Sequence, residues 1–519
     1  MGNDNEGWKI TIVENKGNQN EKNGQYCKEH IDEFLSRRAL IIASNRGPVT
    51  FFTGENGELE YERGGGGLVT ALSGLTRNIK ACWIAHAITE GDNLWEEGDI
   101  PIDDHCAISV KLITSEPKAY DGYYNVISNP LLWFLQHNMW DTVRAPNIDS
   151  ATWTAWDKGY TAVNMQFAQS IAEIIQNSRQ KPLIMIQDYH LYLVPGMVRK
   201  LVRDARSYTL LHFIHIPWPG AEDWSLLPPR MREAILEGLC GVDLLGFQTH
   251  EDSLNFIRTC ESHLPRAHVN YRQGRVWYRN HATLVRDFPI SIDVDALKEL
   301  AESEDVQHHR LQLIDRFGER QLIVRVDRTE PSKNIVRGFQ AFGEMLDLHP
   351  EHRGKVLFLA LLVPSRMEVD EYQNYLDELM AAAGRVNASH GDSDWEPVRI
   401  IVGENYARAI AAMQIYNVLL VNSIADGMNL VAKEGPVVNR QDGVVVLSDR
   451  TGARQQMATG ALIISPCDIY STAEALHQAL VMPAEERADR ARRLRSMVES
   501  EDINDWLCRQ IDVIREKGL

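Results

Sequence analysis

The chain has 519 residues, of which 44% are hydrophobic and 24% are charged, and its formal net charge is −18. This length is enough for roughly two or three domains with substantial cores, and no apolar run approaches the roughly 20 residues that span a bilayer. The acidic balance argues against a nucleic-acid or anionic-membrane surface, so any phosphate site must be a local cluster of arginine and lysine.

The start of the chain predicts a polar leader followed by a buried strand. Residues 1–37 are polar and rich in Asn, Gly, Glu and Lys, which is typical of a loosely held segment. Residues 38–44 (RALIIAS) form the first clear apolar run, and a turn at 45–48 (NRGP) follows it. We therefore expect the first strand to end just before Asn45 and Arg46.

A run of four glycines, from Gly64 to Gly67, precedes the next helical pattern. Glycines in this position let the backbone come close to a ligand, although a flexible hairpin tip has the same composition. The run is neither G-x-G-x-x-G nor a Walker loop, so it indicates neither NAD binding nor ATP hydrolysis.

Three later apolar runs each end in polar side chains. The runs at 182–186, 210–214 and 244–247 lead into QDYH (187–190), HIPWP (215–219) and QTH (248–250), and helical patterns separate them. This alternation predicts a parallel α/β sheet that displays the residues after each strand along one edge. An aromatic-rich stretch at 123–133 suits either core packing or stacking on a sugar ring.

Residues 289–295 lead into a second α/β series. Strands are expected at 321–326, 355–363, 399–402, 418–421, 443–448 and 461–465, followed by helices from about residue 484 and at 503–516. The turn after the first of these strands carries Arg328 and Lys333. Two cations on a strand-to-helix turn could grip a diphosphate, although a pair of exposed surface cations has the same spacing.

The most informative stretch is 416–434 (YNVLLVNSIADGMNLVAKE). A short strand, a break at Asp426-Gly427 and a helix start would place backbone N–H groups and the positive end of a helix dipole at the sheet edge, where they suit an anion. Glu434 lies about one turn into that helix, where a carboxylate can accept hydrogen bonds from a sugar diol. The competing interpretation is a helix that Asp426 caps, with a solvated Glu434.

Seven scattered cysteines form no CxxC pair, and the N-terminus lacks a basic-then-apolar signal. These features predict reduced thiols without a disulfide framework or zinc ribbon, and a cytoplasmic location.

Together the motifs resemble the trehalose-6-phosphate synthase family of retaining glycosyltransferases, from about residue 39 to residue 516. The resemblance rests on SNRGPV (44–49), GGL (66–68), YYN and SNPLLW (within 123–133), QDYHLYLVP (187–195), HIPWP (215–219), DLLGFQT (243–249), VDRTEPSKN (326–334), VPSR (363–366), GRVN (384–387) and DGMNLVAKE (426–434). It implies an α/β GT-B fold, in which two Rossmann-like domains face each other across a cleft. We expect an acceptor-binding domain at 38–294, a nucleotide-sugar-binding domain at 295–495 and a C-terminal helix at 496–519 that crosses back.

The resemblance also implies the site. Catalytic roles fall on Asp188, His215, Arg328, Lys333 and Asp426. The residues implied for the donor are Gly66, Gly67, His215, Arg328, Lys333, Asp426, Gly427, Met428, Asn429, Leu430 and Glu434. Those implied for the acceptor are Arg46, His86, Tyr124, Trp133, Asp188 and Arg366.

The implied reaction moves glucose from UDP- or GDP-glucose to a phosphorylated acceptor, glucose 6-phosphate in the first instance, and yields trehalose 6-phosphate. Cations and amides would stabilise the leaving diphosphate, so no cofactor and no metal are expected. The implied partners are a nucleotide sugar and a sugar phosphate, and a homo-oligomer is compatible with the pattern.

Several positions depart from the family pattern. The usual R-L-D-Y-x-K-G reads RTEPSKN (328–334), the second tryptophan of W-x-G-W is His86, a hinge glycine is Ser291, and Gly435-Pro436-Val437 follows Glu434. Pro436 removes one helical hydrogen bond and can kink the helix at a cost of about 3 kcal/mol. The changes lie on the sugar-facing side, so two alternatives stay open: another acceptor, such as glycerol 3-phosphate or a cyclitol phosphate (including pseudo-glycosyl C–N coupling), or a silent regulatory subunit that binds sugar phosphates.

Overall fold

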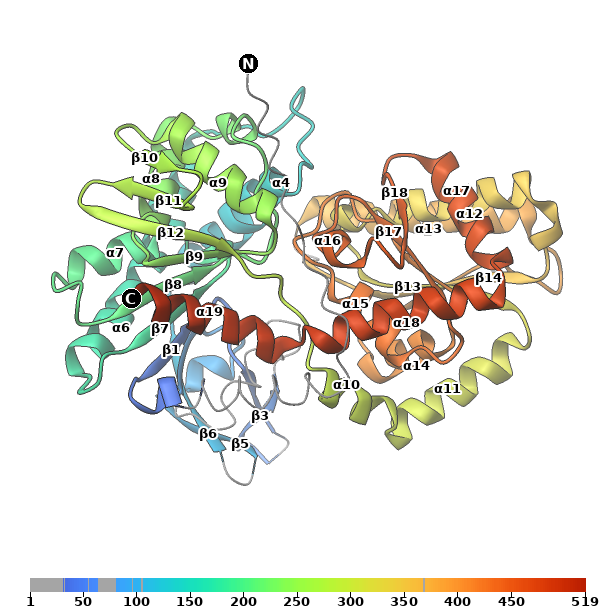
Figure 1. Ribbon diagram of the computed structural model, residues 1–519, viewed down its shortest axis with the longest axis horizontal. Coiled ribbons are helices and arrows are strands. Elements are labelled where there is room, and N and C mark those ends of the chain that lie inside the picture. The colour runs from blue at the N-terminus through green and yellow to red at the C-terminus, as the bar shows by residue number, and fades with distance from the viewer. Residues whose placement is uncertain are drawn as a thin grey trace, which may run out of the picture.

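The computed structural model describes residues 31, 33–54, 56–63, 81–95, 97–103, 106–366 and 369–519. These residues form two α/β lobes side by side (Figure 1). We call the lobe built on the first sheet the N-lobe and the lobe built on the second sheet the C-lobe.

The N-lobe is organised around a ten-stranded sheet with the order β10-β11-β12-β9-β8-β7-β1-β4-β6-β5. The run from β12 to β6 is parallel, while β5, β11 and β10 pair antiparallel at the edges. The strands are β1 (Leu40–Ala43), β4 (Ala81–His86), β5 (Glu97–Asp103), β6 (Cys106–Ile113), β7 (Leu183–Gln187), β8 (Thr209–Phe213), β9 (Leu244–Phe247), β10 (His268–Asn270), β11 (Arg275–Tyr278) and β12 (His281–Asp287).

Helices cover both faces of this sheet. A separate antiparallel hairpin of β2 (Val49–Thr53) and β3 (Leu59–Arg63) follows β1 in the chain. The helical segments are η1 (Asp92–Leu94), α3 (Pro117–Asp121), η2 (Gly122–Leu132), α4 (Trp133–Gln136), α5 (Ser150–Thr154), η3 (Ala155–Tyr160), α6 (Thr161–Asn177), η4 (Tyr189–Leu191), α7 (Val194–Leu201), η5 (Asp223–Leu226), α8 (Pro229–Leu239) and α9 (His250–His263).

The central strands are apolar along their whole length because both faces of the sheet are covered. In β1, Ile42 packs on one face with its register partners Trp83 and Met185, while Ile41 points to the opposite core with Ile184. This burial confirms the predicted parallel strands at 38–44, 182–186, 210–214 and 244–247 to within about two residues.

The C-lobe is a six-stranded, wholly parallel sheet with the order β15-β14-β13-β16-β17-β18. Its strands are β13 (Gln321–Arg328), β14 (Val356–Val363), β15 (Val398–Val402), β16 (Val418–Val421), β17 (Val444–Ser448) and β18 (Leu462–Ile464). Its helical segments are α10 (Val294–Ala301), α11 (Glu304–Phe317), η6 (Pro331–Lys333), α12 (Ile335–Leu348), η7 (Pro350–His352), α13 (Asp370–His390), α14 (Tyr406–Ile415), α15 (Leu430–Val438), α16 (Arg454–Met457), α17 (Ile469–Val481) and α18 (Ala484–Ser500).

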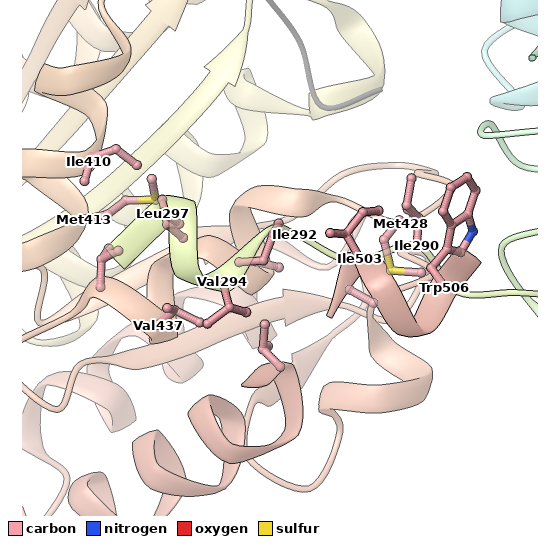
Figure 2. Close-up of a cluster of buried hydrophobic side chains, with 14 of the residues drawn as sticks. Ile290, Ile292, Val294, Leu297, Ile410, Met413, Met428, Val437, Ile503 and Trp506 are labelled. Atoms are coloured by element: carbon pink, nitrogen blue, oxygen red, sulfur yellow. The ribbon is translucent and has the colours of Figure 1, made fainter. Parts of the chain in front are cut away.

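The last helix, α19 (Ile503–Lys517), leaves the C-lobe and lies against the N-lobe (Figure 1). Its Trp506 packs edge-on against Phe213 at a ring-centroid distance of 5.1 Å. Figure 2 shows Ile290 and Ile292, from the segment that joins the lobes, in one apolar cluster with Met428 and Ile503. The lobes are therefore joined both by this segment and by the return of α19.

Two further observations concern the class of protein. None of the helices in the described parts of the chain has the length and apolarity that crossing a membrane requires. Cys82, Cys240, Cys260 and Cys467 are free thiols, but Cys508 on α19 takes part in a disulfide. The expectation of reduced cysteines throughout is therefore wrong at Cys508.

Candidate active site

The predicted site residues gather where the carboxyl ends of the two sheets meet. In the N-lobe they follow β1, β7 and β8 or lie on η2 and α4, and in the C-lobe they follow β13, β14 and β16. The carboxyl ends of parallel strands share one edge of a sheet, which is where ligands bind in open α/β folds.

Lys333 and Asp426 form the centre of the C-lobe part. The Nζ of Lys333 lies 2.5 Å from Oδ2 of Asp426, which also accepts hydrogen bonds from the Asn429 amide at 3.1 Å and the Ser423 hydroxyl at 3.3 Å. Burial alone would lower the pKa of Lys333 and raise that of Asp426, but the ion pair together with neighbouring charges and hydrogen bonds outweighs burial in both groups. Both side chains are therefore charged at neutral pH.

Arg328 and Arg366 are joined by a carboxylate that sequence reasoning treated only as a departure. Glu330 is fully buried, and its two oxygens lie 2.8 Å from Nη2 of Arg328 and 3.2 Å from Nη1 of Arg366. Burial acts to raise the pKa of Glu330, whereas the positive charges of the two arginines act to lower it. The pKa of Glu330 is lowered overall. The spacing Arg-x-Glu within RTEPSKN was the available signal, because residues i and i+2 at a strand end point to the same side.

Trp133 of the N-lobe lies beneath both guanidinium groups. The Cζ of Arg366 is 4.0 Å from the centre of the Trp133 ring, and the Cζ of Arg328 is 5.8 Å from it. Arg366 also donates to the Tyr189 hydroxyl at 3.2 Å and to the Tyr372 hydroxyl. Arg366 is thus a contact between the lobes as well as a predicted acceptor residue.

Tyr124 lies close to a second group of positively charged side chains. The side chains of Arg46 and Asn129 lie near its hydroxyl, and its ring stacks on that of His190 at a centroid distance of 5.9 Å. Burial would raise the pKa of Tyr124, but Arg366 and Arg46 outweigh burial and lower it. Arg46 itself is exposed, so its guanidinium can contact a ligand.

His86 lies behind this group. Its Nδ1 is 2.6 Å from the carbonyl oxygen of Ala87 and its Nε2 is 2.9 Å from the Ser115 hydroxyl, so both ring nitrogens already have protein partners. Burial lowers its pKa to about 4. The ring stacks on Tyr120 at 4.2 Å, and Tyr120 stacks on Tyr124 at 5.6 Å. His86 therefore reaches the predicted acceptor residues through Tyr120, which the sequence did not single out.

Asp188 and His215 stand together after β7 and β8. The backbone N–H of His215 donates to Oδ1 of Asp188 at 3.2 Å, and Nε2 of His215 lies 2.9 Å from the side-chain oxygen of Gln187. Asp188 holds a left-handed backbone conformation with φ 67°, which non-glycine residues adopt at a cost. Burial raises the pKa of Asp188 to about 7 and lowers that of His215 to about 3.

The turn between β16 and α15 carries the remaining donor residues. Asn429 has φ 77°, and its side-chain oxygen accepts the N–H of Ala432 at 3.0 Å, which caps α15. The side chain of Met428 is in the core and that of Leu430 is half-buried, so the backbone of 427–429 is the polar part of this turn. The helix start and its dipole are suited to an anion.

Glu434 lies one turn further along α15. Its Oε1 accepts a hydrogen bond from the Tyr406 hydroxyl at 3.1 Å, and burial raises its pKa to about 7. Pro436 falls in the last turn of the same helix, which continues to Val438, and the Pro436 carbonyl accepts from Arg495 at 3.1 Å. Gly66 and Gly67 lie outside the described residues.

Comparison with known proteins gives one consistent match. The sequence model of glycosyltransferase family 20 matches residues 38–516. The UDP-forming α,α-trehalose-phosphate synthase of Schizosaccharomyces pombe is 32% identical over 461 residues, which cover 87% of this chain and 85% of that protein. An Escherichia coli trehalose-6-phosphate structure bound with UDP-2-fluoro glucose has a TM-score of 0.79 and 28% identity, over 92% of this chain and 98% of the other. A Burkholderia xenovorans UDP-forming synthase in complex with glucose-6-phosphate has a TM-score of 0.77 and 26% identity, over 92% and 100%.

Proposed function

Because this chain belongs to glycosyltransferase family 20, we propose that it transfers glucose from UDP-glucose to glucose 6-phosphate and forms trehalose 6-phosphate. The fold is the expected GT-B arrangement of two Rossmann-like lobes. The relatives are named as UDP-forming enzymes, which supports UDP over GDP as the nucleotide.

One observation carries the proposal: two groups of cations meet at the junction of the lobes. Arg328 and Lys333 follow β13 in the C-lobe, whereas Arg46 and Arg366 surround Tyr124. A protein of net charge −18 that gathers four cations here is suited to two anionic substrates. A nucleotide diphosphate on one side and a sugar phosphate on the other meet this requirement.

In the proposed mechanism the leaving diphosphate is stabilised by Arg328, Lys333 and the amides of 427–429 at the start of α15. Glu434 holds the ribose hydroxyls, and Gly67 of the glycine run closes over the donor. Asp188 and His215 position the donor sugar at the reaction centre. As the glycosidic bond breaks, the acceptor hydroxyl attacks from the same face and its proton passes to the departing phosphate oxygen. Positioning and charge stabilisation supply the catalysis, and no metal is needed.

The acceptor is the part of the proposal that most needs a test. Both ring nitrogens of His86 are occupied by protein groups, so the chain lacks a free polar group at that position. This observation favours an acceptor with fewer hydroxyls, glycerol 3-phosphate, as the second candidate.

A donor and acceptor screen tests the function. UDP- and GDP-glucose are each combined with glucose 6-phosphate, glycerol 3-phosphate and a cyclitol phosphate, and the products are identified by mass spectrometry. We expect trehalose 6-phosphate, with UDP released in equal amount, only from the first donor and first acceptor. If the product is a different glucosylated phosphate, the acceptor that gave it replaces glucose 6-phosphate in the proposal. If no donor and acceptor pair releases nucleotide, the protein is a silent regulatory subunit.

A further inference from the structure

A cluster of three histidines and two glutamates lies in the C-lobe, away from the junction of the lobes. His349, Glu351 and His352 follow α12, and Glu474 and His477 lie one turn apart on α17, along which α12 packs (Figure 1). None of these side chains belongs to the proposed transfer site.

The cluster contains three side chains whose ligand atoms converge. One nitrogen or oxygen from each of His349, Glu351 and His477 lies within 4.8 Å of the other two. Nδ1 of His349 and Oε1 of Glu351 are 3.6 Å apart, too far for a good hydrogen bond. This separation is close to the about 3.3 Å between two ligand atoms that each lie about 2.0–2.1 Å from a tetrahedral zinc ion.

The remaining two side chains orient the histidines. Nε2 of His349 lies 2.9 Å from Oε1 of Glu474, and Nδ1 of His477 lies 2.9 Å from Nε2 of His352. Histidines that bind metals commonly donate their second N–H to a carboxylate or another acceptor, which fixes the ring and the tautomer. Glu474 fills that position for His349, and His352 holds the ring of His477 in the orientation observed.

We propose that His349, Glu351 and His477 bind one divalent transition-metal ion of the zinc type, with His349 oriented by Glu474. Three protein ligands of two imidazoles and one carboxylate suit such an ion and leave a fourth position for water. The rings of His349 and His477 are stacked in parallel at 3.6 Å. Because a metal lies in the plane of each imidazole that binds it, the ring of His477 turns away from His352 when the ion enters, while Glu474 holds the ring of His349 in place.

The proposed site is remote from the transfer chemistry. α12 begins two residues after Lys333 and has 14 residues, so His349 lies about 21 Å further along the helix. A bound ion would fix the end of α12 to α17 and stabilise the C-lobe without entering the reaction. Metal binding and glucosyl transfer can therefore be measured independently.

Titration calorimetry tests the proposal on the full chain. Protein treated with a chelator and desalted is titrated with zinc chloride at pH 7.5, and we expect one equivalent to bind and the Tm to rise. Glu351 is exposed, so Glu351→Gln removes a ligand without disturbing packing and should weaken binding at least tenfold. His477→Ala should abolish binding, and Glu474→Gln should weaken it by about 10- to 100-fold.

Two controls separate this site from adventitious binding. His268→Ala changes an exposed histidine of β10 and should bind zinc as the parent does. Magnesium chloride should give no comparable heat, because Mg²⁺ prefers oxygen ligands. Absence of saturable zinc binding, or parent-like binding by both Glu351→Gln and His477→Ala, would overturn the proposal and leave the cluster as a hydrogen-bonded contact between α12 and α17.

Discussion

At the scale of single residues, the carboxylate of Glu330 links the two substrate sites that the sequence treats separately. It holds Arg328, predicted for the donor, and Arg366, predicted for the acceptor, and both arginines lie over the ring of Trp133. A buried carboxylate between two guanidinium groups fixes their separation, because each charge would be uncompensated without it. We therefore propose that Glu330 positions both arginines for the two substrates.

Glu330→Gln tests this role. We expect kcat/KM to fall by roughly a hundredfold or more, with KM raised for both substrates, because breaking a buried ion pair costs about 3–5 kcal/mol. Glu330→Asp keeps the charge and should recover much of the activity. The matched control is Glu344→Gln, the same change at an exposed position of α12. Unchanged KM values in Glu330→Gln, with circular dichroism like that of the parent, would refute the positioning role.

Glu434 should make donor binding depend on pH. Burial raises its pKa to about 7, so the carboxylate that we propose accepts the ribose hydroxyls is mostly neutral at pH 6 and mostly charged at pH 8. We expect UDP-glucose to bind about tenfold more weakly at pH 6 than at pH 8, as one group with this pKa requires.

Calorimetry with UDP-glucose alone measures this effect without the titration of a sugar phosphate, and Glu434→Gln should lose about tenfold of the pH dependence and keep only what Asp188, whose pKa is also about 7, contributes. The effect of this group on folding stability has the opposite dependence on pH. The folded chain holds this proton more tightly than the unfolded chain, so the stabilisation is present below about pH 4 and is lost as the pH rises through 7. Equal UDP-glucose affinity at pH 6 and pH 8 in the parent would contradict the ribose role.

At the scale of elements, the sequence predicts the parallel strands well and the antiparallel additions poorly. Strands buried on both faces, such as β14 and β16, are apolar throughout and so were visible. The hairpin β2–β3 and the edge strands β10 and β11 are partly exposed and mixed in composition, so no periodic signal distinguishes them from loops.

The same reasoning applies to the site. Residues that follow strands in the chain, such as Asp188, Arg328 and Asp426, could be placed because topology alone brings strand ends together. Tyr120 and Tyr406 meet their partners through side-chain packing between distant segments, which no local pattern encodes. The occupied nitrogens of His86 depend on Ser115 and are likewise a tertiary feature.

Gly427, in the turn between β16 and α15, tests how closely the lobes must meet. A Cβ added there would overlap the carbonyl oxygen of His215 in the other lobe, so Gly427→Ala should separate the two lobes locally. We expect kcat to fall by at least tenfold while the chain stays folded, because small displacements of reacting groups are costly. Gly384→Ala on α13 is the control, since a Cβ there meets no atom within 4 Å. Parent-like kcat in Gly427→Ala would show that this contact does not set the geometry.

At the scale of the whole molecule, contacts at several places join the described parts of the two lobes. Arg366 of the C-lobe reaches Tyr189 of the N-lobe at 3.2 Å, and α19 returns to pack Trp506 on Phe213. At the connecting segment, the N–H of Ile503 donates to the Ile292 carbonyl at 3.1 Å, and Nζ of Lys433 donates to the Ile290 carbonyl at 2.7 Å. Lys433, which precedes Glu434, therefore ties α15 to the segment that joins the lobes.

Lys433→Met tests this tie through its effect on stability. The Lys433 side chain is buried, and burial lowers its pKa to about 7. Between pH 7 and pH 9 the unfolded lysine keeps its proton while the folded one loses it, so stability rises with pH by about 2 kcal/mol from this group alone. Urea unfolding at both pH values should show that rise in the parent and a smaller one, by about that amount, in Lys433→Met. An identical pH dependence in parent and variant would mean that Lys433 stays charged, and that an ammonium group rather than a neutral amine anchors the segment between the lobes.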